Sequence, residues 1–205
     1  TLCDWFSKAD KNGPLPFDDN FKCIMPDKDG NSEEDLFSEI KVLLNSSFNP
    51  VHPGSLAHLD PPPLTFSILG DLIAAGLNNN LLAYELSPSV TLLEDSLCKW
   101  FAKKIGFNDS SGGIAASGGT LSNLNALIAA RHNAGLGSDP NSVLLVSEDA
   151  HSSFIKCTKI MGLDDANLVR IKTDNKGCID IQNLRKTLDK CSIDNKKIFA
   201  IVATL

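Results

Sequence analysis

A four-residue turn of glycine and hydroxyl side chains is the feature of this sequence best suited to binding an anion. It consists of Ser117, Gly118, Gly119 and Thr120, and we name it the SGGT turn. A predicted helix follows it, so backbone N–H groups, the helix dipole and two hydroxyl groups would converge on a bound phosphate. The turn matches neither the P-loop nor the G-x-G-x-x-G pattern, which argues against a mononucleotide or dinucleotide site. An ordinary strand-to-helix turn is the alternative interpretation.

His151 is the second candidate for chemistry. It follows an apolar strand predicted to end near Val146. Ligands of open α/β sheets bind outside the carboxyl ends of the strands, and the SGGT turn lies at the same end by the same rule. An imidazole in this position can stack on a flat ring or transfer a proton. The alternative is a polar loop residue that only caps the next helix.

A hydrolase site is a further possibility. Ser117 or Ser152 would act with His151 and Asp149, but no G-x-S-x-G elbow is present. A pair between Cys157 and His151 is disfavoured, because six residues do not bring two side chains to one face of a helix. Neither nucleophilic arrangement has the spacing that its chemistry needs.

A metal site is also not supported. His52, His58 and Asp60 offer imidazole and carboxylate groups, but their spacing matches no zinc pattern. The six cysteines contain no C-x-x-C pair, since the two nearest in sequence are thirteen residues apart. We therefore expect no metal, and reduced, mostly buried thiols in a cytoplasmic protein.

The elements that position these candidates alternate between strand and helix. Apolar runs predict strands at residues 114–116, 143–146, 168–171 and 198–205, and helical periodicity predicts helices at 121–131, 152–161 and 181–189. Alternation with short links is typical of a mostly parallel α/β sheet.

The first part of the chain is predicted to be helical after an irregular start. Residues 1–31 are expected to form an extended arm or loop. Ser32 is an N-cap before a helix that reaches residue 44, and residues 64–77 form an apolar helix. Ser87-Pro88 starts a further helix that ends at Gly106.

The composition excludes several classes of protein. The chain has 205 residues, 42% of them apolar, with a net charge of −6 and a pI near 5.1. An acidic globular chain of this kind is a poor binder of nucleic acid, which requires clustered Lys and Arg. No apolar run approaches the roughly 20 residues that span a bilayer, and the first residues do not resemble a signal peptide. We expect neither a nucleic-acid nor a membrane partner.

The last eight residues are a continuous apolar run, residues 198–205. Such a run predicts a strand buried on both faces of a parallel sheet. A central strand needs elements on both flanks, so we expect the sequence to be a piece of a larger protein.

Several motifs, in this order and spacing, make the sequence similar to the N-terminal half of group II pyridoxal-phosphate-dependent amino-acid decarboxylases. The family includes enzymes for aromatic amino acids, glutamate, cysteine sulfinate and diaminobutyrate. The resemblance runs from about residue 52 to residue 205. The motifs are His52-Pro53 with His58-Leu59, Ser87-Pro88-x-x-Thr91-x-x-Glu94, the SGGT turn with Ser122-Asn123, Asp149-Ala150-His151-Ser152-Ser153, and Val202-Ala203-Thr204-Leu205.

The resemblance implies roles for the matching residues. The SGGT turn would hold the phosphate of pyridoxal 5′-phosphate (PLP). His151 would stack over the pyridine ring and take part in catalysis near the substrate carboxylate, and Thr204 would lie beside the ring. His58, Leu59 and Pro61 would line the substrate pocket. Aromatic-specific members often carry bulkier ring residues there, so we favour a non-aromatic amino acid.

The fold implied by the resemblance is α/β. Residues 1–86 would form a helical dimerisation arm. Residues 87–205 would be the first part of the mostly parallel-sheet large domain of a PLP-dependent transferase (aspartate aminotransferase-like, fold type I), incomplete at its C-terminal end. The complete enzyme would be a cytoplasmic homodimer.

The resemblance also places the Schiff-base lysine beyond residue 205. No lysine in this sequence stands in the family's His-Lys context. We therefore expect this chain to be inactive without the C-terminal remainder of the enzyme, which would convert an L-amino acid to its amine and carbon dioxide. A non-catalytic phosphate-ligand or assembly module of the same fold, or another PLP lyase or aminotransferase, are the alternatives.

Overall fold

A computed structural model describes residues 2–11, 25, 28, 30–56 and 59–204 of the chain. The chain divides into two compact units, Thr1–Asn80 and Leu81–Leu205. The candidate residues after position 86 all belong to the second unit, so each unit is described by itself.

The first unit is helical. Its elements are α1 (Leu2–Ser7), the 3₁₀ helix η1 (Ala9–Lys11), α2 (Glu33–Asn45) and α3 (Thr65–Leu77). The helices predicted after Ser32 and over residues 64–77 are confirmed, and the Ser32 Oγ accepts a hydrogen bond from the Asp35 N–H at 3.1 Å. This is the N-cap contact that the sequence predicts.

The prediction of an irregular start is wrong for α1 and η1. A contact distant in sequence accounts for the difference, because the buried Asn49 donates from Nδ2 to the Trp5 carbonyl at 3.1 Å. Tertiary contacts of this kind override weak local propensity. Residues 12–24, 26, 27 and 29, which belong to the same predicted segment, lie outside the described residues.

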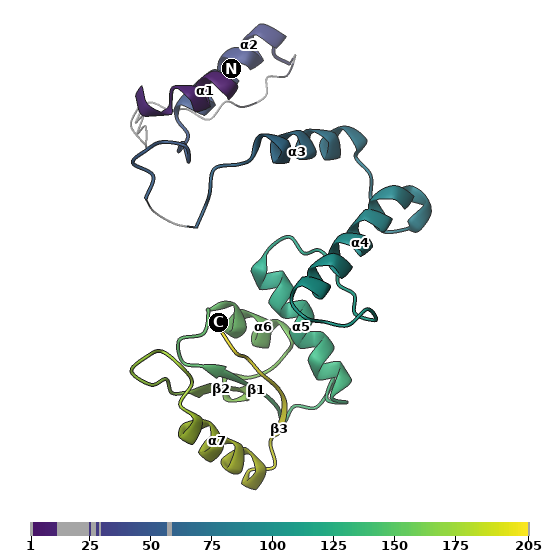
Figure 1. Cartoon of the computed structure of the whole chain (residues 1–205), viewed down its shortest axis with the longest axis vertical. Coiled ribbons are helices and arrows are strands. Elements are labelled where there is room, and N and C mark those ends of the chain that lie inside the picture. Colours follow the sequence, from purple (N-terminus) through teal and green to yellow (C-terminus); the bar gives the residue numbers. More distant parts are fainter. Residues whose placement is uncertain (1, 12–24, 26–27, 29, 57–58, 205) are drawn as a thin grey trace. The chain divides into compact units, whose positions relative to one another are not determined.

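The second unit is an α/β layer structure (Figure 1). Its three strands are parallel, in the order β2-β1-β3, which confirms the predicted sheet type. Its elements are η2 (Tyr84–Leu86), α4 (Pro88–Lys104), α5 (Gly119–Asn133), β1 (Ser142–Ser147), α6 (Ser153–Ile160), η3 (Asp165–Asn167), β2 (Leu168–Ile171), α7 (Ile181–Ile193) and β3 (Lys197–Ile201).

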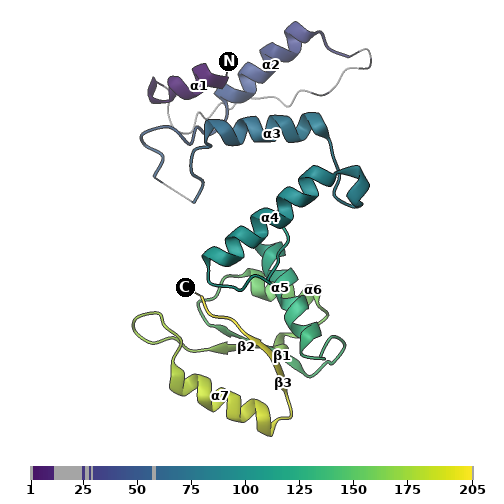
Figure 2. The same cartoon turned by 45° about the vertical axis from the view of Figure 1, so that its right-hand side comes forward.

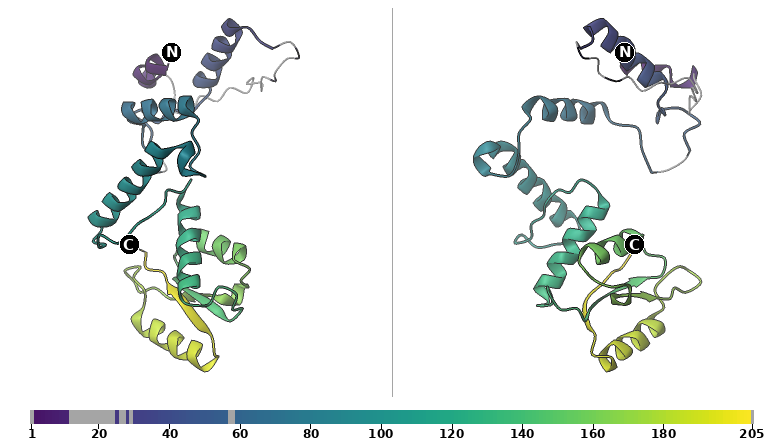
Figure 3. Two further views of the ribbon diagram at one scale, coloured as in Figure 1. Left: turned by 90° about the vertical axis from the view of Figure 1, so that its right-hand side faces the viewer. Right: turned by 180° about the vertical axis from the view of Figure 1, so that it is seen from behind.

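The central strand β1 is buried along its whole length and divides the core in two. Leu144 and Val146 pack with residues of α5 and α6 on one face. Val143 and Leu145 pack with residues of β2 and α7 on the other face. Both panels of Figure 3 show α7 separated from α5 and α6 by the strands. Alternate residues of a strand point to opposite faces, so one apolar strand supplies both halves of the core.

The strand predicted at residues 114–116 does not form in the described chain. This segment is extended, but no described strand pairs with it. A strand is assigned from ladder hydrogen bonds to a neighbour, and the Ala115 N–H instead donates to Glu94 of α4 at 2.8 Å. Figure 2 shows the chain turning after α4 and running back beside it to the start of α5.

The prediction of a final strand buried on both faces is also wrong in part. β3 ends at Ile201, and within it only Phe199 is buried. The reason is its position, since β3 lies at the edge of the sheet and pairs with β1 alone among the described strands. The strand that fits the doubly buried description is β1.

Within the described residues, none of the helices has both the length and the apolar character needed to cross a membrane.

Candidate functional site

The SGGT turn forms the N-terminal end of α5. Gly118 is the N-cap residue, and no side chain caps the helix there. The first N–H groups of an α-helix have no partner within the helix, so they remain available to an anion. Gly118 has φ of 170°, an extended value that any residue adopts, so backbone conformation does not require glycine at this position.

The two glycines of the turn instead provide space. A Cβ atom added to Gly118 or to Gly119 would meet no other atom of the protein within 4 Å. The hydroxyl residues Ser117 and Thr120 are exposed on either side. A group that approaches the turn can therefore reach the backbone closely and find hydroxyl donors beside it, which fits a phosphate.

The turn forms one wall of a surface depression of about 410 Å³. Apolar side chains from α5 and α6 complete its walls, which gives a polar end for an anion and an apolar side for the rest of a ligand. Its lining residues are Ser117, Gly118, Gly119, Thr120, Leu121, Leu124 and Ile160. The four residues that sequence reasoning grouped are thus brought together, whereas neither His151 nor Thr204 lines this depression.

His151 lies in the loop between β1 and α6, and its side chain is exposed. Its Nδ1 atom accepts a hydrogen bond from the Ser153 backbone N–H at 3.1 Å. A ring nitrogen that accepts a hydrogen bond carries no proton, so the neutral ring has its proton on Nε2. The loop therefore presents an imidazole of defined tautomer.

A side-chain contact links the helix of the SGGT turn to the helix that follows His151. Asn123 of α5 donates from Nδ2 to the Oγ atom of Ser153 at 3.0 Å, and Ser153 is fully buried. Sequence reasoning quoted both residues in its motifs but gave neither a role. The available signal was a polar residue three positions after Thr120 and another two positions after His151.

Cys157 packs where α6 meets the start of α5. Its Sγ atom lies 3.7 Å from the carbonyl oxygen of Thr120, and the side chain is buried. Burial raises the pKa of this thiol above its ordinary value of 9.0, because a thiolate is poorly solvated in the core. Cys157 is thus a packing residue with little nucleophilic character, and the Cys–His alternative is excluded.

The geometry also excludes the hydrolase alternative. In a catalytic triad the carboxylate accepts from Nδ1–H of the histidine. Here Nδ1 of His151 is itself an acceptor, and Asp149 Oδ2 accepts from the Thr173 hydroxyl at 2.9 Å. No set of three His, Cys, Asp or Glu side chains that could hold a metal ion occurs among the residues described.

Thr204 follows β3, beyond the carboxyl end of that strand. The Val202 N–H donates to the Leu145 carbonyl at 2.9 Å, so β3 and β1 run together up to this edge. The two strands are parallel, so Thr204 and His151 both follow the same edge of the sheet. Thr204 is exposed.

The predicted substrate-pocket residues belong to the first unit. Leu59 and Pro61 are exposed there, Leu59 to 96%. His58 lies outside the described residues. Their assignment to a pocket stays a prediction that rests on the resemblance.

Comparison with known proteins identifies relatives along most of the chain. An L-2,4-diaminobutyrate decarboxylase of Acinetobacter baumannii is 28% identical over 202 residues, which cover 88% of this chain and 40% of that protein. An aromatic-L-amino-acid decarboxylase of Bacillus atrophaeus is 28% identical over 180 residues, covering 87% of this chain and 37% of the relative. The chain thus spans well under half the length of these relatives.

Solved structures agree in fold. The Catharanthus roseus tryptophan decarboxylase in complex with L-tryptophan superposes with a TM-score of 0.86 at 22% identity, over 100% of this chain and 46% of that one. The glutamate decarboxylase domain of a Vibrio parahaemolyticus protein gives a TM-score of 0.85 at 21% identity, over 98% of this chain and 49% of that one. These likenesses confirm the predicted fold type I architecture.

A model of one protein family covers most of the sequence. It is the pyridoxal-dependent decarboxylase conserved domain, and it matches residues 21–205. This match confirms the family that the order of the motifs indicated, and it confirms PLP as the cofactor of the family. From residue 21 to residue 205, this chain belongs to the pyridoxal-dependent decarboxylase family.

Proposed function

We propose that this chain supplies the phosphate-binding turn and an active-site histidine of an enzyme that decarboxylates an L-amino acid to its amine and carbon dioxide. The observation that carries the proposal is the uncapped start of α5, with open space over two adjacent glycines. A phosphate group fits this arrangement, and PLP is the phosphate-bearing cofactor of the family.

The roles of the residues follow from their chemistry. The N–H groups of the SGGT turn and the hydroxyls of Ser117 and Thr120 hold the phosphate. When bound, PLP provides an electron sink for the bond that breaks at the α-carbon of the amino acid. His151 would stack on the ring of the bound cofactor and could offer its Nε2–H to the substrate carboxylate, and Thr204 would lie beside the ring. The tautomer of His151 supports this use of Nε2.

We further propose that activity requires residues outside these 205. No histidine in the sequence is followed directly by a lysine, the context in which the family places its Schiff-base lysine. Relatives are more than twice as long as the matched segment. Their additional length supports the proposal that this chain acts together with a C-terminal remainder of the enzyme. Without that remainder, we expect the chain not to decarboxylate an amino acid.

The substrate we propose is a non-aromatic L-amino acid, with His58, Leu59 and Pro61 at its pocket. Relatives are named for varied substrates, among them L-2,4-diaminobutyrate in Acinetobacter baumannii and cysteine sulfinic acid in Mus musculus. Aromatic-L-amino-acid decarboxylase is also among them, so the choice depends on His58, Leu59 and Pro61 standing where aromatic-specific members often carry bulkier ring residues.

The first unit supports a role in dimerisation. We propose that residues 1–86 form the arm of a homodimer and that residues 87–205 begin the PLP-binding large domain. Large apolar side chains on α2 and α3 are exposed, which is typical of surfaces that a partner covers. Examples are Phe37 at 61%, Phe66 at 85% and Leu72 at 68%. We also propose a cytoplasmic location, which the free cysteines support.

The test is carried out on the protein that contains this sequence, supplied with PLP and a panel of L-amino acids. The panel includes 2,4-diaminobutyrate, aspartate, glutamate, cysteine sulfinate, tryptophan and tyrosine. We expect carbon dioxide and the matching amine from a non-aromatic member. Bound PLP with an oxo-acid product would indicate an aminotransferase instead. Bound PLP with no turnover of any amino acid would favour the non-catalytic module.

A further inference from the structure

Glu94 is the last residue of the motif Ser87-Pro88-x-x-Thr91-x-x-Glu94 at the start of α4, and the proposed function gives it no role. Its Oε1 atom accepts a hydrogen bond from the Ala115 backbone N–H at 2.8 Å. The two residues are 21 positions apart, so the contact joins α4 to the chain that returns beside it. The Glu94 side chain is partly buried, and the hydrogen bond itself lies at the surface.

The backbone of the same segment also lies close to α4 at Gly113. A Cβ atom added to Gly113 would lie 3.2 Å from the Cβ of Cys98, closer than two such atoms normally approach. Glycine therefore allows the backbone to lie against α4 at this point. Two residues later, the Ala115 N–H forms its hydrogen bond to Glu94, so the close approach and the bond occur in the same stretch of backbone.

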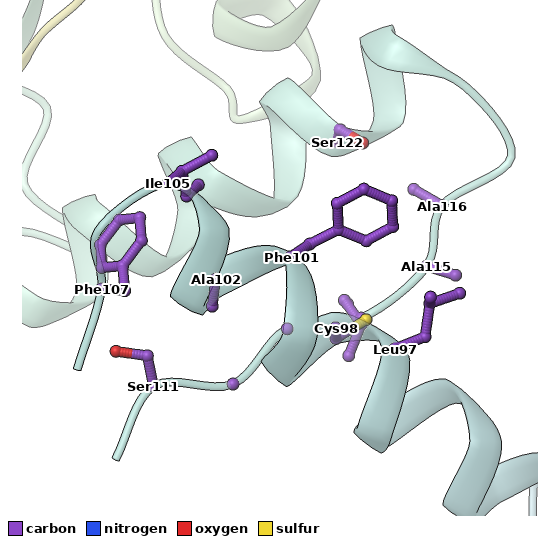
Figure 4. A pocket seen from close by; sticks show the side chains of 13 residues that line it. Leu97, Cys98, Phe101, Ala102, Ile105, Phe107, Ser111, Ala115, Ala116 and Ser122 are labelled. Carbon is purple, nitrogen blue, oxygen red and sulfur yellow. The ribbon is translucent and has the colours of Figure 1, made fainter. Parts of the chain in front are cut away.

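A cavity lies beside these two contacts. It has a volume of about 560 Å³ and lies between α4, the start of α5 and residues 111–116, which we call the returning segment. Figure 4 shows the Phe101 ring directed from α4 into the space between Ala116 and Ser122. No described strand pairs with residues 114–116. The hydrogen bond to Glu94 is thus a directional contact between this backbone and α4.

The returning segment leads directly into the SGGT turn. Only Ala116 separates Ala115 from Ser117, so a displacement of Ala115 carries over to the turn. Anion binding by backbone N–H groups depends on their alignment before the ligand arrives. We propose that Glu94 is a positioning residue that aligns the SGGT turn for phosphate. This inference rests on the proposed phosphate-binding role of the turn.

The experiment compares two probes on this chain. Pyridoxine 5′-phosphate carries the phosphate but no aldehyde, so it does not react with surface lysines, and pyridoxine lacks the phosphate. Calorimetry gives the affinity of each probe, and the ratio of the two affinities measures phosphate recognition. Glu94→Ala removes the acceptor and Glu94→Gln keeps an oxygen acceptor. Asp95→Ala is the control, because Asp95 is the next residue along α4 and its ion pair with Lys99 is exposed.

We expect Glu94→Ala to lower the affinity for pyridoxine 5′-phosphate about tenfold, as the loss of a hydrogen bond to a charged acceptor does. The affinity for pyridoxine stays unchanged. Glu94→Gln keeps most of the affinity for pyridoxine 5′-phosphate, and Asp95→Ala keeps all of it. Amide hydrogen exchange of residues 114–120 speeds up in Glu94→Ala alone. A purely structural role would weaken both probes equally.

Ala115→Pro removes the donor of the same hydrogen bond, so it carries the test if Glu94→Ala does not fold. We expect the same loss of phosphate recognition, and no further loss when the two changes are combined. If the unchanged chain binds both probes equally, the proposed role of the turn fails. If it prefers the phosphate and Glu94→Ala keeps that preference, only the inference about Glu94 fails.

Discussion

The side-chain amide of Asn123 and the hydroxyl of Ser153 are joined by a hydrogen bond of 3.0 Å that links α5 to α6. Asn123 lies one turn after the SGGT turn, and Ser153 donates its backbone N–H to His151. One polar pair therefore ties the candidate phosphate site to the loop of the candidate histidine.

Replacing Asn123 by alanine tests this link. The change removes the bond to a buried hydroxyl, so we expect it to lower the free energy of unfolding by about 1–2 kcal/mol. The measurement is urea denaturation followed by circular dichroism. Asn125→Ala is the matched control, because residues two apart on a helix do not share a face. Equal effects of the two changes would contradict the assigned role of Asn123.

The tautomer of His151 is the second prediction. The Ser153 N–H donates to Nδ1, so the neutral imidazole carries its proton on Nε2. Long-range ¹H–¹⁵N spectra of the chain at a pH where the ring is neutral distinguish the two tautomers directly. Spectra of a His151→Ala variant assign the signal. A ring protonated on Nδ1 would show that the bond from Ser153 does not form.

Replacing Gly119 by alanine separates binding from stability. The added methyl group meets no other atom of the protein within 4 Å, and alanine favours helix more than glycine does. We expect the thermal unfolding midpoint to stay the same or to rise. The methyl group occupies the space for an anion, so the affinity for pyridoxine 5′-phosphate falls about tenfold or more. Unchanged affinity in this variant would place the phosphate elsewhere.

The pair of Asp139 and Lys197 predicts a pH dependence. A hydrogen bond from Lys197 Nζ at 2.8 Å lowers the pKa of Asp139 below its ordinary value of 3.8. A carboxyl group with a lowered pKa in the folded state stabilises that state above the unfolded pKa, and this contribution is lost as the pH falls through the folded pKa.

Lys197→Met should therefore lower the urea midpoint at pH 7, and the difference from the unchanged chain should shrink as the pH falls below about 4 and vanish below the lowered folded-state pKa of Asp139. The effect is small, because both side chains contact solvent. Lys186→Met, a change of equal charge on α7, provides the comparison. A difference that stays constant as the pH falls from 7 to about 2 would contradict the ion pair as its source.

The reactivity of the cysteines is the fifth prediction. Burial raises the pKa of Cys157, whereas Cys3 and Cys178 are exposed. At pH 8 we expect iodoacetamide to label Cys3 and Cys178 first, and Cys157 only when the chain unfolds in urea. Peptide mass spectrometry measures each site. Early labelling of Cys157 in the folded chain would show that α6 does not pack on α5.

Local pattern predicted the elements of the second unit well, for reasons that its residues make plain. Apolar runs marked β1 and β2, and Ser87-Pro88 marked the start of α4. The SGGT turn was recognisable because glycine and hydroxyl residues before a helix have a direct use in anion binding. These features depend on neighbours in sequence, so the sequence shows them.

Contacts across the chain could not be predicted in the same way. The bond from Ala115 to Glu94 spans 21 residues and that from Asn123 to Ser153 spans 30, and no local rule pairs such positions. The strand predicted at residues 114–116 shows the same limit, because a strand needs a neighbour as well as a sequence. The half-exposed β3 was misjudged for that reason too.

The edge position of β3 has a practical consequence for handling this chain. One side of β3 pairs with β1, and its other side carries backbone groups that no described strand engages. A strand edge with N–H and C=O groups of this kind is a template for intermolecular strand addition. The half-exposed Ile201 adds an apolar contact at the end of the strand. Concentrated solutions of the chain should therefore form sheet-linked aggregates while the helices remain folded.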